Sequence, residues 1–92
     1  MSATKYINSK SQMEIVCIEH GLTVKEYQVL TFCMDGHMTD AEIRCELFLT
    51  KDQFQRIVDA LRAKSLVGRR KGLLIASIEG RSAFYEVLPL AA

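Results

Sequence analysis

Residues 39–71 read TDAEIRCELFLTKDQFQRIVDALRAKSLVGRRK, and this stretch decides the fold. Thr39 and Thr50 each stand three residues before a Glu or Gln, which is the spacing of a helix-opening capping box. In such a box the threonine hydroxyl accepts the backbone N–H three residues on, and the Glu or Gln side chain accepts the threonine N–H. Only residues 48–49 remain to turn the chain between the two helices. The stretch therefore predicts a helix, a tight turn, a second helix and a basic strand.

The second of these helices, residues 50–63, is amphipathic. Its apolar residues recur at i, i+3, i+4 and i+7 and so form one helical stripe: Phe54, Ile57, Val58 and Leu61. The opposite face is polar and carries Lys51, Gln53, Gln55, Arg56 and Asp59. A second helix with one buried and one polar side is what a helix-turn-helix presents to the major groove of DNA. We therefore interpret this stretch as a helix-turn-helix.

Two further helices are predicted before this pair. Residues 1–10 are polar and are expected to form a flexible arm, with an edge strand around Tyr6 and Ile7 as the alternative. A helix is predicted at about residues 11–20, ended by Gly21. A third capping box begins the next helix at Thr23, and that helix ends at a turn in residues 35–37.

A hairpin and one helix are predicted after the pair. Ser65 stands where the chain must leave the helical conformation, and residues 66–78 read as two strands around a turn at Lys71-Gly72. A last helix is predicted at residues 82–88, stopped by Pro89. The order of helices, hairpin and final helix is that of a winged helix.

Length and composition fit one such domain. Ninety-two residues, 49% hydrophobic and 25% charged, suit a single globular unit with one small core. We expect a mainly α winged helix-turn-helix domain with a small β-hairpin at residues 11–89, and a tail at residues 90–92. The net charge is only +1, but residues 1–48 carry four Lys/Arg and seven Asp/Glu, whereas residues 49–92 carry eight and four. The basic charge thus lies where a DNA-binding protein needs it.

Neither a membrane segment nor a signal peptide is predicted, because no apolar run approaches the roughly 20 residues of a bilayer span. We therefore expect a cytoplasmic protein. The three cysteines, Cys17, Cys33 and Cys45, each fall within a predicted helix, where a buried thiol behaves as a small hydrophobe. All three are expected to be reduced.

Four segments resemble the winged-helix regulators of the multiple-antibiotic-resistance (MarR) family. Residues 22–30, LTVKEYQVL, are similar to the family's LTxxEYxVL run, and residues 39–50 to its TxxEI…L…LS helix-turn. The recognition-helix pattern VSRxVxxLxxxGLVxR resembles residues 54–69, and the LTxxGR helix start resembles residues 78–81. The resemblance implies a winged helix that binds DNA.

The chain departs from this family at three points. Arg44 stands where the family has a small residue in the first helix of the helix-turn-helix, and Ser65 stands at a glycine-like position. Dimers of the family use long flanking helices, whereas the terminal helices predicted here are short. No ligand pocket is therefore carried over, and a small-molecule effector stays unassigned.

On the second helix, the candidate DNA-binding residues are Thr50, Lys51, Gln53, Gln55 and Arg56. Arg suits the O6 and N7 acceptors of guanine, and Gln suits N6 and N7 of adenine. Thr50 and Lys51, at the helix N-terminus, suit a phosphate. The alternative is a solvated helix face, which Asp52 and Asp59 favour because phosphates repel carboxylates.

The candidate wing is the densest charge cluster in the chain, formed by Arg69, Arg70 and Lys71. Three cations at a hairpin tip cannot pair with one another, so water or an outside group must offset their repulsion. As a functional site they form a wing that lies on phosphates or reaches into a minor groove. As the alternative, they form a solvated turn.

No metal, cofactor or catalytic site is predicted. Cys17, His20, Cys33 and His37 have metal-ligand types at tolerable spacings, but core packing explains the two cysteines without a metal. The sequence has no Gly-rich phosphate loop and no paired carboxylates in an apolar setting. We do not expect an enzyme.

These patterns predict a small transcriptional regulator that binds double-stranded DNA with some sequence preference. Residues 50–63 would enter the major groove and residues 66–78 would lie on the backbone. The alternative is a winged helix that binds a protein partner, which the near-neutral charge, Asp52, Asp59 and Arg44 favour.

A homodimer through the terminal helices is also expected, because one recognition helix reads too few base pairs for useful genomic specificity. Apolar residues at both ends of the chain offer a surface for it. They are Ile15 and Ile18 near the start and Phe84, Tyr85, Val87, Leu88 and Leu90 near the end.

Overall fold

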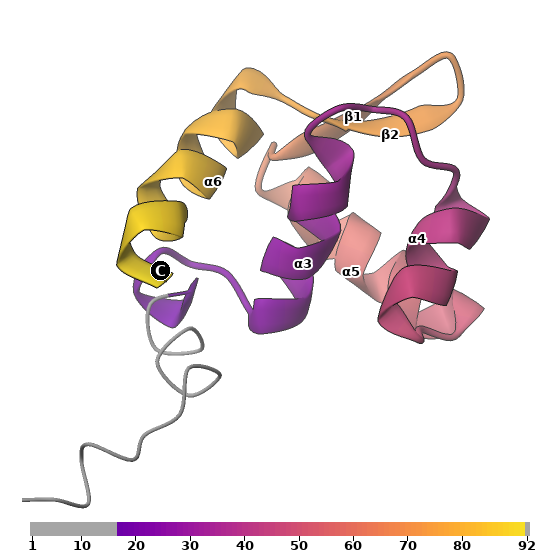
Figure 1. Ribbon diagram of the computed structural model, residues 1–92, viewed down its shortest axis with the longest axis horizontal. Helices are drawn as coiled ribbons and strands as arrows, with labels where there is room; N and C mark the ends of the chain where they lie inside the picture. The colour runs from indigo at the N-terminus through magenta and orange to yellow at the C-terminus, as the bar shows by residue number, and fades with distance from the viewer. Residues whose placement is uncertain (1–16, 92) are drawn as a thin grey trace, which may run out of the picture.

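The computed structural model describes residues 17–91, and their element order is that of the predicted winged helix (Figure 1). In chain order the elements are α3 (Val24–Cys33), α4 (Asp40–Leu47), α5 (Lys51–Ala63), β1 (Val67–Arg70), β2 (Leu73–Ala76) and α6 (Ile78–Ala91). One helical turn, residues 17–19, precedes α3. The arm predicted at residues 1–10 and most of the helix predicted at residues 11–20 lie outside the described residues.

Helix α3 is central to the fold. It lies between α6 on one side and α4 with α5 on the other, and the hairpin crosses one end of the helices (Figure 1). Every element contributes at least one apolar side chain to the core. In β1 this is its first residue, Val67. The most deeply buried, each at most 3% exposed, are Cys17, Leu22, Val29, Leu30, Cys33, Ile43, Phe54, Val58, Leu61, Leu74 and Val87.

All three predicted capping boxes are present, so local sequence sets where α3, α4 and α5 begin. The hydroxyls of Thr23, Thr39 and Thr50 accept the backbone N–H three residues on, at 3.1, 3.2 and 3.1 Å. In return, Oε1 of the Glu or Gln side chain accepts the threonine N–H at 3.1, 2.8 and 2.9 Å. Each box satisfies two N–H groups that a helix start would otherwise leave without a partner.

Three helices end in the same way, with a residue of positive φ followed by leucine. Gly21 (φ 78°), Phe48 (φ 55°) and Ser65 (φ 61°) adopt the left-handed conformation. The N–H of the next residue then donates to a carbonyl five residues back: Leu22 to Cys17 at 2.7 Å, Leu49 to Arg44 at 2.9 Å and Leu66 to Leu61 at 2.9 Å. These are Schellman ends, whose apolar last residue packs back onto the protein. The predicted stop at Gly21 and the predicted exit at Ser65 are both confirmed.

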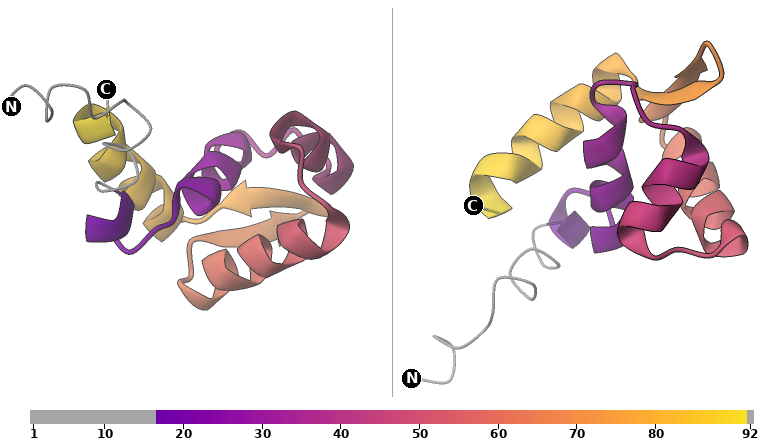
Figure 2. Two further views of the ribbon diagram at one scale, coloured as in Figure 1. Left: turned by 90° about the horizontal axis from the view of Figure 1, so that it is seen from below. Right: turned by 45° about the vertical axis from the view of Figure 1, so that its right-hand side comes forward.

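The hairpin is shorter than predicted but has the predicted turn. β1 and β2 pair antiparallel from Val67 opposite Ala76 to Arg70 opposite Leu73. Lys71 (φ 54°) and Gly72 (φ 80°) join them, and two successive positive φ angles are those of a type I′ turn. The turn projects beyond the helices (Figure 2).

Helix α6 differs from the prediction at both ends. The returning strand ends at Ala76 instead of residue 78, because Ser77 caps a helix that begins at Ile78. Its Oγ accepts the N–H of Gly80 at 2.9 Å and donates to the Ser65 carbonyl at 2.6 Å. The helix does not stop at Pro89, and residues 90–91, predicted as a tail, belong to it. Proline removes one backbone donor, and here that loss does not end the helix.

Two contacts hold α6 against the rest of the chain. The rings of Tyr27 on α3 and Phe84 on α6 stack with centroids 5.4 Å apart and planes 9° apart. Two residues further along α6, Glu86 Oε2 lies 3.5 Å from Nδ1 of His20, an ion pair when the histidine is protonated. Phe84 and Val87, which the sequence offered as dimer surface, instead pack toward the core. In the described part of the chain, no helix has the length and apolar character needed to cross a membrane.

Candidate nucleic-acid interface

The polar face of α5 is exposed along its length, as predicted, while Phe54, Val58 and Leu61 are buried beneath it. β1 packs along α5, so the helix and the hairpin are neighbours (Figure 2). The exposed side chains of the helix include four of the candidates and two carboxylates: Lys51, Asp52, Gln53, Gln55, Arg56 and Asp59. The fifth candidate, Thr50, is exposed at the cap.

The two glutamines on this face are already engaged. Gln53 Oε1 accepts the backbone N–H of Thr50 at 2.9 Å as part of the capping box. Gln55 Nε2 donates to Asp59 Oδ1 at 2.9 Å, one helical turn on. Reading adenine with a glutamine needs its oxygen and its nitrogen together. Each contact uses one of the two acceptor sites of the Gln53 oxygen or one of the two N–H groups of the Gln55 nitrogen, so both side chains have fewer sites left for a base.

Arg56 is placed differently from the glutamines. It is exposed in the middle of α5, and no hydrogen bond or ion pair engages it within residues 17–91. Asp52 and Asp59 lie four residues before it and three after it on the same face, yet neither pairs with it in this structure. All five guanidinium N–H donors are therefore free for an outside group.

The N-terminus of α5 offers a second polar feature. Thr50 caps the helix, and the exposed side chain of Lys51 follows at its first residue. The first N–H groups of a helix have no partner within it and carry the positive end of its dipole. An anion can bind there, although Asp52 on the next residue acts against it.

The wing cations do not form one free cluster. Arg69 pairs with Asp40, the first residue of α4: Nη1 donates to Oδ1 at 2.7 Å and Nη2 to Oδ2 at 2.9 Å. Nη1 also donates to the carbonyl of Gly72 at 3.2 Å. The hydrogen bond to Asp40 raises the pKa of the Arg69 guanidinium above its ordinary value. The outside group that offsets the repulsion at the tip is thus Asp40.

Arg70 and Lys71 remain exposed beside this pair. Among the described residues, neither side chain has a hydrogen-bond or ion-pair partner. Together with Lys51 and Arg56, they are the candidate cations that stay open to an outside anion.

No sequence pattern indicates the role of Asp40, because 29 residues separate it from Arg69. A Schellman end also leaves Phe48 in the turn between α4 and α5, 93% exposed and in a conformation that favours glycine. Neither residue was a candidate. The position of Phe48 in a two-residue turn could have indicated its exposure, whereas only the folded chain shows the partner of Asp40.

The cysteines depart in part from expectation. Cys17 and Cys33 are buried, but Cys45 is exposed, because it lies two residues from buried Ile43 and hence on the opposite side of α4. All three are free thiols. Burial raises the pKa of the Cys33 thiol to about 12, and burial also raises that of Cys17. In the described part of the chain no three Cys, His, Asp or Glu side chains gather in a way that could hold a metal ion.

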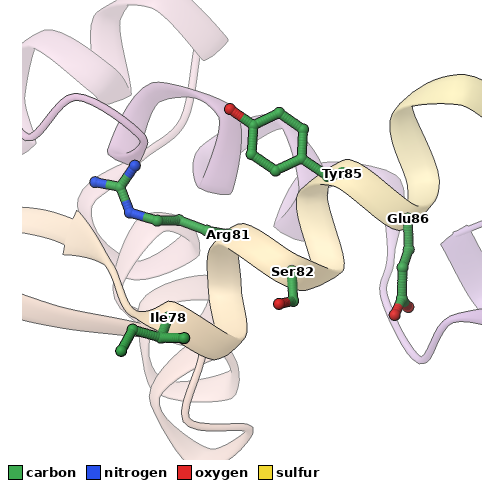
Figure 3. Close-up of a pocket in the computed structure, with 5 residues that line it drawn as sticks. All are labelled: Ile78, Arg81, Ser82, Tyr85 and Glu86. Carbon is green, nitrogen blue, oxygen red and sulfur yellow. The ribbon is translucent and has the colours of Figure 1, made fainter.

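A separate exposed face lies on α6. Ile78, Arg81, Ser82, Tyr85 and Glu86 line a shallow hollow of about 460 Å³, and all five come from this one helix (Figure 3). Ile78 is 82% exposed and Tyr85 58%. Arg81 reaches away from the hollow, where its Nη2 donates to the carbonyl of Met34 at 2.9 Å.

Comparison with solved structures places this arrangement among known folds. A transcriptional regulator of the MarR family from Rhodococcus sp. RHA1 superposes with a TM-score of 0.84 at 20% identity, over 98% of this chain and 70% of that one. The multiple antibiotic-resistance repressor MarR of Listeria monocytogenes 4b F2365 gives 0.82 at 20% identity, over 97% and 65%.

The fold is that of a MarR-type winged helix. A third MarR-type structure, the Mycobacterium tuberculosis protein Rv2887 in complex with DNA, gives a TM-score of 0.78 at 15% identity, over 89% of this chain and 66% of that one. The chain thus spans about two thirds of the length of these three proteins. No protein-family model and no curated protein matches the sequence. The resemblance predicted from residues 22–81 is confirmed at the level of the MarR-type fold.

Proposed function

We propose that this MarR-type winged helix binds double-stranded DNA with some sequence preference and acts as a small transcriptional regulator in the cytoplasm. Helix α5 enters the major groove, and the hairpin, as the wing, lies on the phosphate backbone. The observation that carries the proposal is Arg56, exposed and unengaged at the centre of a helix whose other side is buried in the core. The proposal needs no cofactor, metal or catalytic residue.

Within this interface we assign base reading to Arg56 and not to the glutamines. A free guanidinium matches the O6 and N7 acceptors of guanine, which is the commonest specific contact in the major groove. Gln53 and Gln55 each have one of their two polar atoms engaged within α5. Lys51, Arg70 and Lys71 are assigned to phosphates, with Thr50 at the helix cap beside them.

A homodimer completes the proposal. The start of the described chain and α6 lie side by side, joined by His20 and Glu86 (Figure 1). Three large apolar side chains on the helical turn at residues 17–19 and along α6 are exposed: Ile18 at 65%, Ile78 at 82% and Tyr85 at 58%. A contact between two copies through this region would remove them from water and present two recognition helices to two half-sites.

The second candidate is a winged helix that binds a protein partner. Asp52 and Asp59 on the exposed face of α5 favour it, because a phosphate backbone repels both carboxylates. Asp52 is the sharper probe of the two, since Asp59 also holds Gln55.

Titration of a mixed-sequence fluorescent duplex at several salt concentrations tests the proposal. Three phosphate contacts per protomer predict a log–log slope of roughly −2.7, from about 0.9 per contact. Asp52→Asn should tighten binding, because it removes a charge that faces phosphate. Absence of binding even at about 50 mM salt, or an Asp52→Asn affinity equal to that of the wild type, would favour the protein partner.

A further inference from the structure

The Asp40–Arg69 pair joins two elements that have different places in the proposed interface. Both Nη atoms of the guanidinium face both carboxylate oxygens, at 2.7 and 2.9 Å, which is the bidentate geometry of the stronger ion pairs. The side chains are only 35% and 40% exposed. With the bond to Gly72, three of the five N–H donors of Arg69 are used within the protein.

The position of Asp40 at the start of α4 favours its negative charge. As the first residue of α4 it follows the cap Thr39, where the helix dipole stabilises a negative charge. The loop before it also touches the hairpin: a Cβ built on Gly36 would lie 3.0 Å from Cδ1 of Ile75 on β2. The hairpin is therefore attached to residues 36–40 at two points, one apolar and one charged.

Arg69 also reaches the turn of the hairpin. Its bond to the Gly72 carbonyl holds the residue after Lys71, inside the type I′ turn. The side chain of Arg70, next along β1, is exposed and donates to no described residue. One arginine thus connects α4, β1 and the turn, while the adjacent arginine and lysine stay open.

We propose that Arg69 is a positioning residue which does not bind DNA: with Asp40 it ties the wing to α4, so that Arg70 and Lys71 meet phosphates while Arg56 is in the groove. This inference rests on the proposed function. It separates the three wing cations, which the sequence presents as equivalent, into one that orders the hairpin and two that bind.

The competing account treats Asp40 as a counter-ion that Arg69 leaves when DNA arrives. The two accounts predict opposite signs for Asp40→Asn. That change frees Arg69 and removes one negative charge, so it tightens binding if Arg69 contacts a phosphate. Asp40→Asn weakens binding if the Asp40–Arg69 pair orders the hairpin, because ordering the hairpin in the variant then costs binding free energy.

The test measures dissociation constants for one duplex between about 50 and 200 mM salt. Asp40→Asn and Arg69→Ala should each bind about threefold to tenfold more weakly with an unchanged salt slope, because ordering one loosened segment costs this much. Arg70→Ala is the matched control, with the same residue type on the same strand. Its slope should fall by about 0.9. Tighter binding by Asp40→Asn, or an equal fall in slope for Arg69→Ala, overturns the proposal.

Arg69→Lys distinguishes loss of the Asp40–Arg69 pair from unfolding of the domain. Lysine keeps the charge but cannot span both carboxylate oxygens and the Gly72 carbonyl. The tie predicts that it binds as weakly as Arg69→Ala, with a wild-type melting temperature to within a few degrees. Retention of wild-type affinity by Arg69→Lys would instead indicate a phosphate contact.

The role of the Asp40–Arg69 pair in ordering the hairpin can be tested even if the proposed DNA binding is wrong. If the wild type binds no duplex, hydrogen exchange of the free protein still tests the pair. Asp40→Asn should then speed exchange of the β1 and β2 amides relative to those of α3. Unchanged exchange in the hairpin would show that the pair does not order the wing.

Discussion

Hydrogen-bonding capacity separates Arg56 from the glutamines beside it. Helical periodicity puts all three on one polar face, but only the folded chain shows which atoms are free. Gln53 helps to cap its own helix, and Gln55 bonds to Asp59. On the proposed function the discriminating contact is assigned to Arg56, so a change there should alter which base is preferred as well as how tightly DNA binds.

Arg56→Ala should lower specific binding by roughly 1–3 kcal/mol and relax the preference at one base position. Competition titration of the preferred duplex against single-base variants measures both effects. Arg62→Ala is the control, since it removes an equal charge from the exposed last turn of the same helix. The role assigned to Arg56 is wrong if both variants lose affinity equally on every duplex.

Phe48 carries a backbone cost that no visible contact offsets. Its φ of 55° is costly for a residue with a Cβ, and its ring is 93% exposed. Phe48→Gly should raise the free energy of unfolding by about 0.5–1 kcal/mol, measured by urea denaturation. Phe48→Ala removes the ring but keeps the Cβ, so its stability should stay near that of the wild type. A Phe48→Gly variant less stable than Phe48→Ala would contradict this account of the turn.

At the scale of elements, boundaries that depend on neighbouring residues were predictable. Thr23, Thr39 and Thr50 each find their partner three residues on, so α3, α4 and α5 begin as the sequence predicts. The start of α6 was not predictable in this way. Ser77 has glycine, not Glu or Gln, three residues on, and its cap is completed by the distant carbonyls of Ser65 and Leu66.

The candidate site likewise combines features that neighbouring residues predict with one that depends on a distant residue. Periodicity predicts which residues of α5 are exposed, because the apolar stripe that is buried leaves the opposite face to solvent. Periodicity does not predict the partner of Arg69, because Asp40 is brought to it only when α4 and the hairpin pack together. The exposure of Cys45 could have been predicted, since it lies two residues from the buried Ile43 on a short helix.

Gly80 shows how closely α6 approaches the junction after α5. A Cβ at this position would lie 2.0 Å from the carbonyl oxygen of Leu66, which also accepts the N–H of Ser77. Gly80→Ala should therefore cost roughly 2 kcal/mol or more, despite the better helix propensity of alanine. Thermal denaturation should show a fall of about 10 °C for a domain of this size.

Gly68→Ala is the matched control for that measurement. Nothing lies within 4 Å of a Cβ built on Gly68, so the melting temperature should change little. Equal effects of the two substitutions would contradict the close contact between Gly80 and Leu66.

For the whole molecule, the exposed apolar side chains near the two ends predict association. Light scattering at micromolar concentration should give about twice the chain mass of 10.4 kDa. Tyr85→Glu should shift the mass toward the monomer, because it places a charge in the proposed contact. Phe48→Glu, a change to a still more exposed aromatic residue, should leave the mass unchanged, because the turn between α4 and α5 lies on the opposite side of α3 from α6 (Figure 1). A monomer at all concentrations would remove the dimer from the proposal.

Selection from random duplex DNA by the purified protein, at near-physiological salt, tests whether α5 reads DNA. The account predicts enrichment of an inverted repeat whose half-site centres are about 10 base pairs apart, set by two recognition helices on one face of the duplex. Each half-site should contain a guanine whose enrichment disappears with Arg56→Ala. A pool that stays random after repeated rounds, or an enriched site indifferent to Arg56, would contradict the assignment of α5 as a DNA-reading helix.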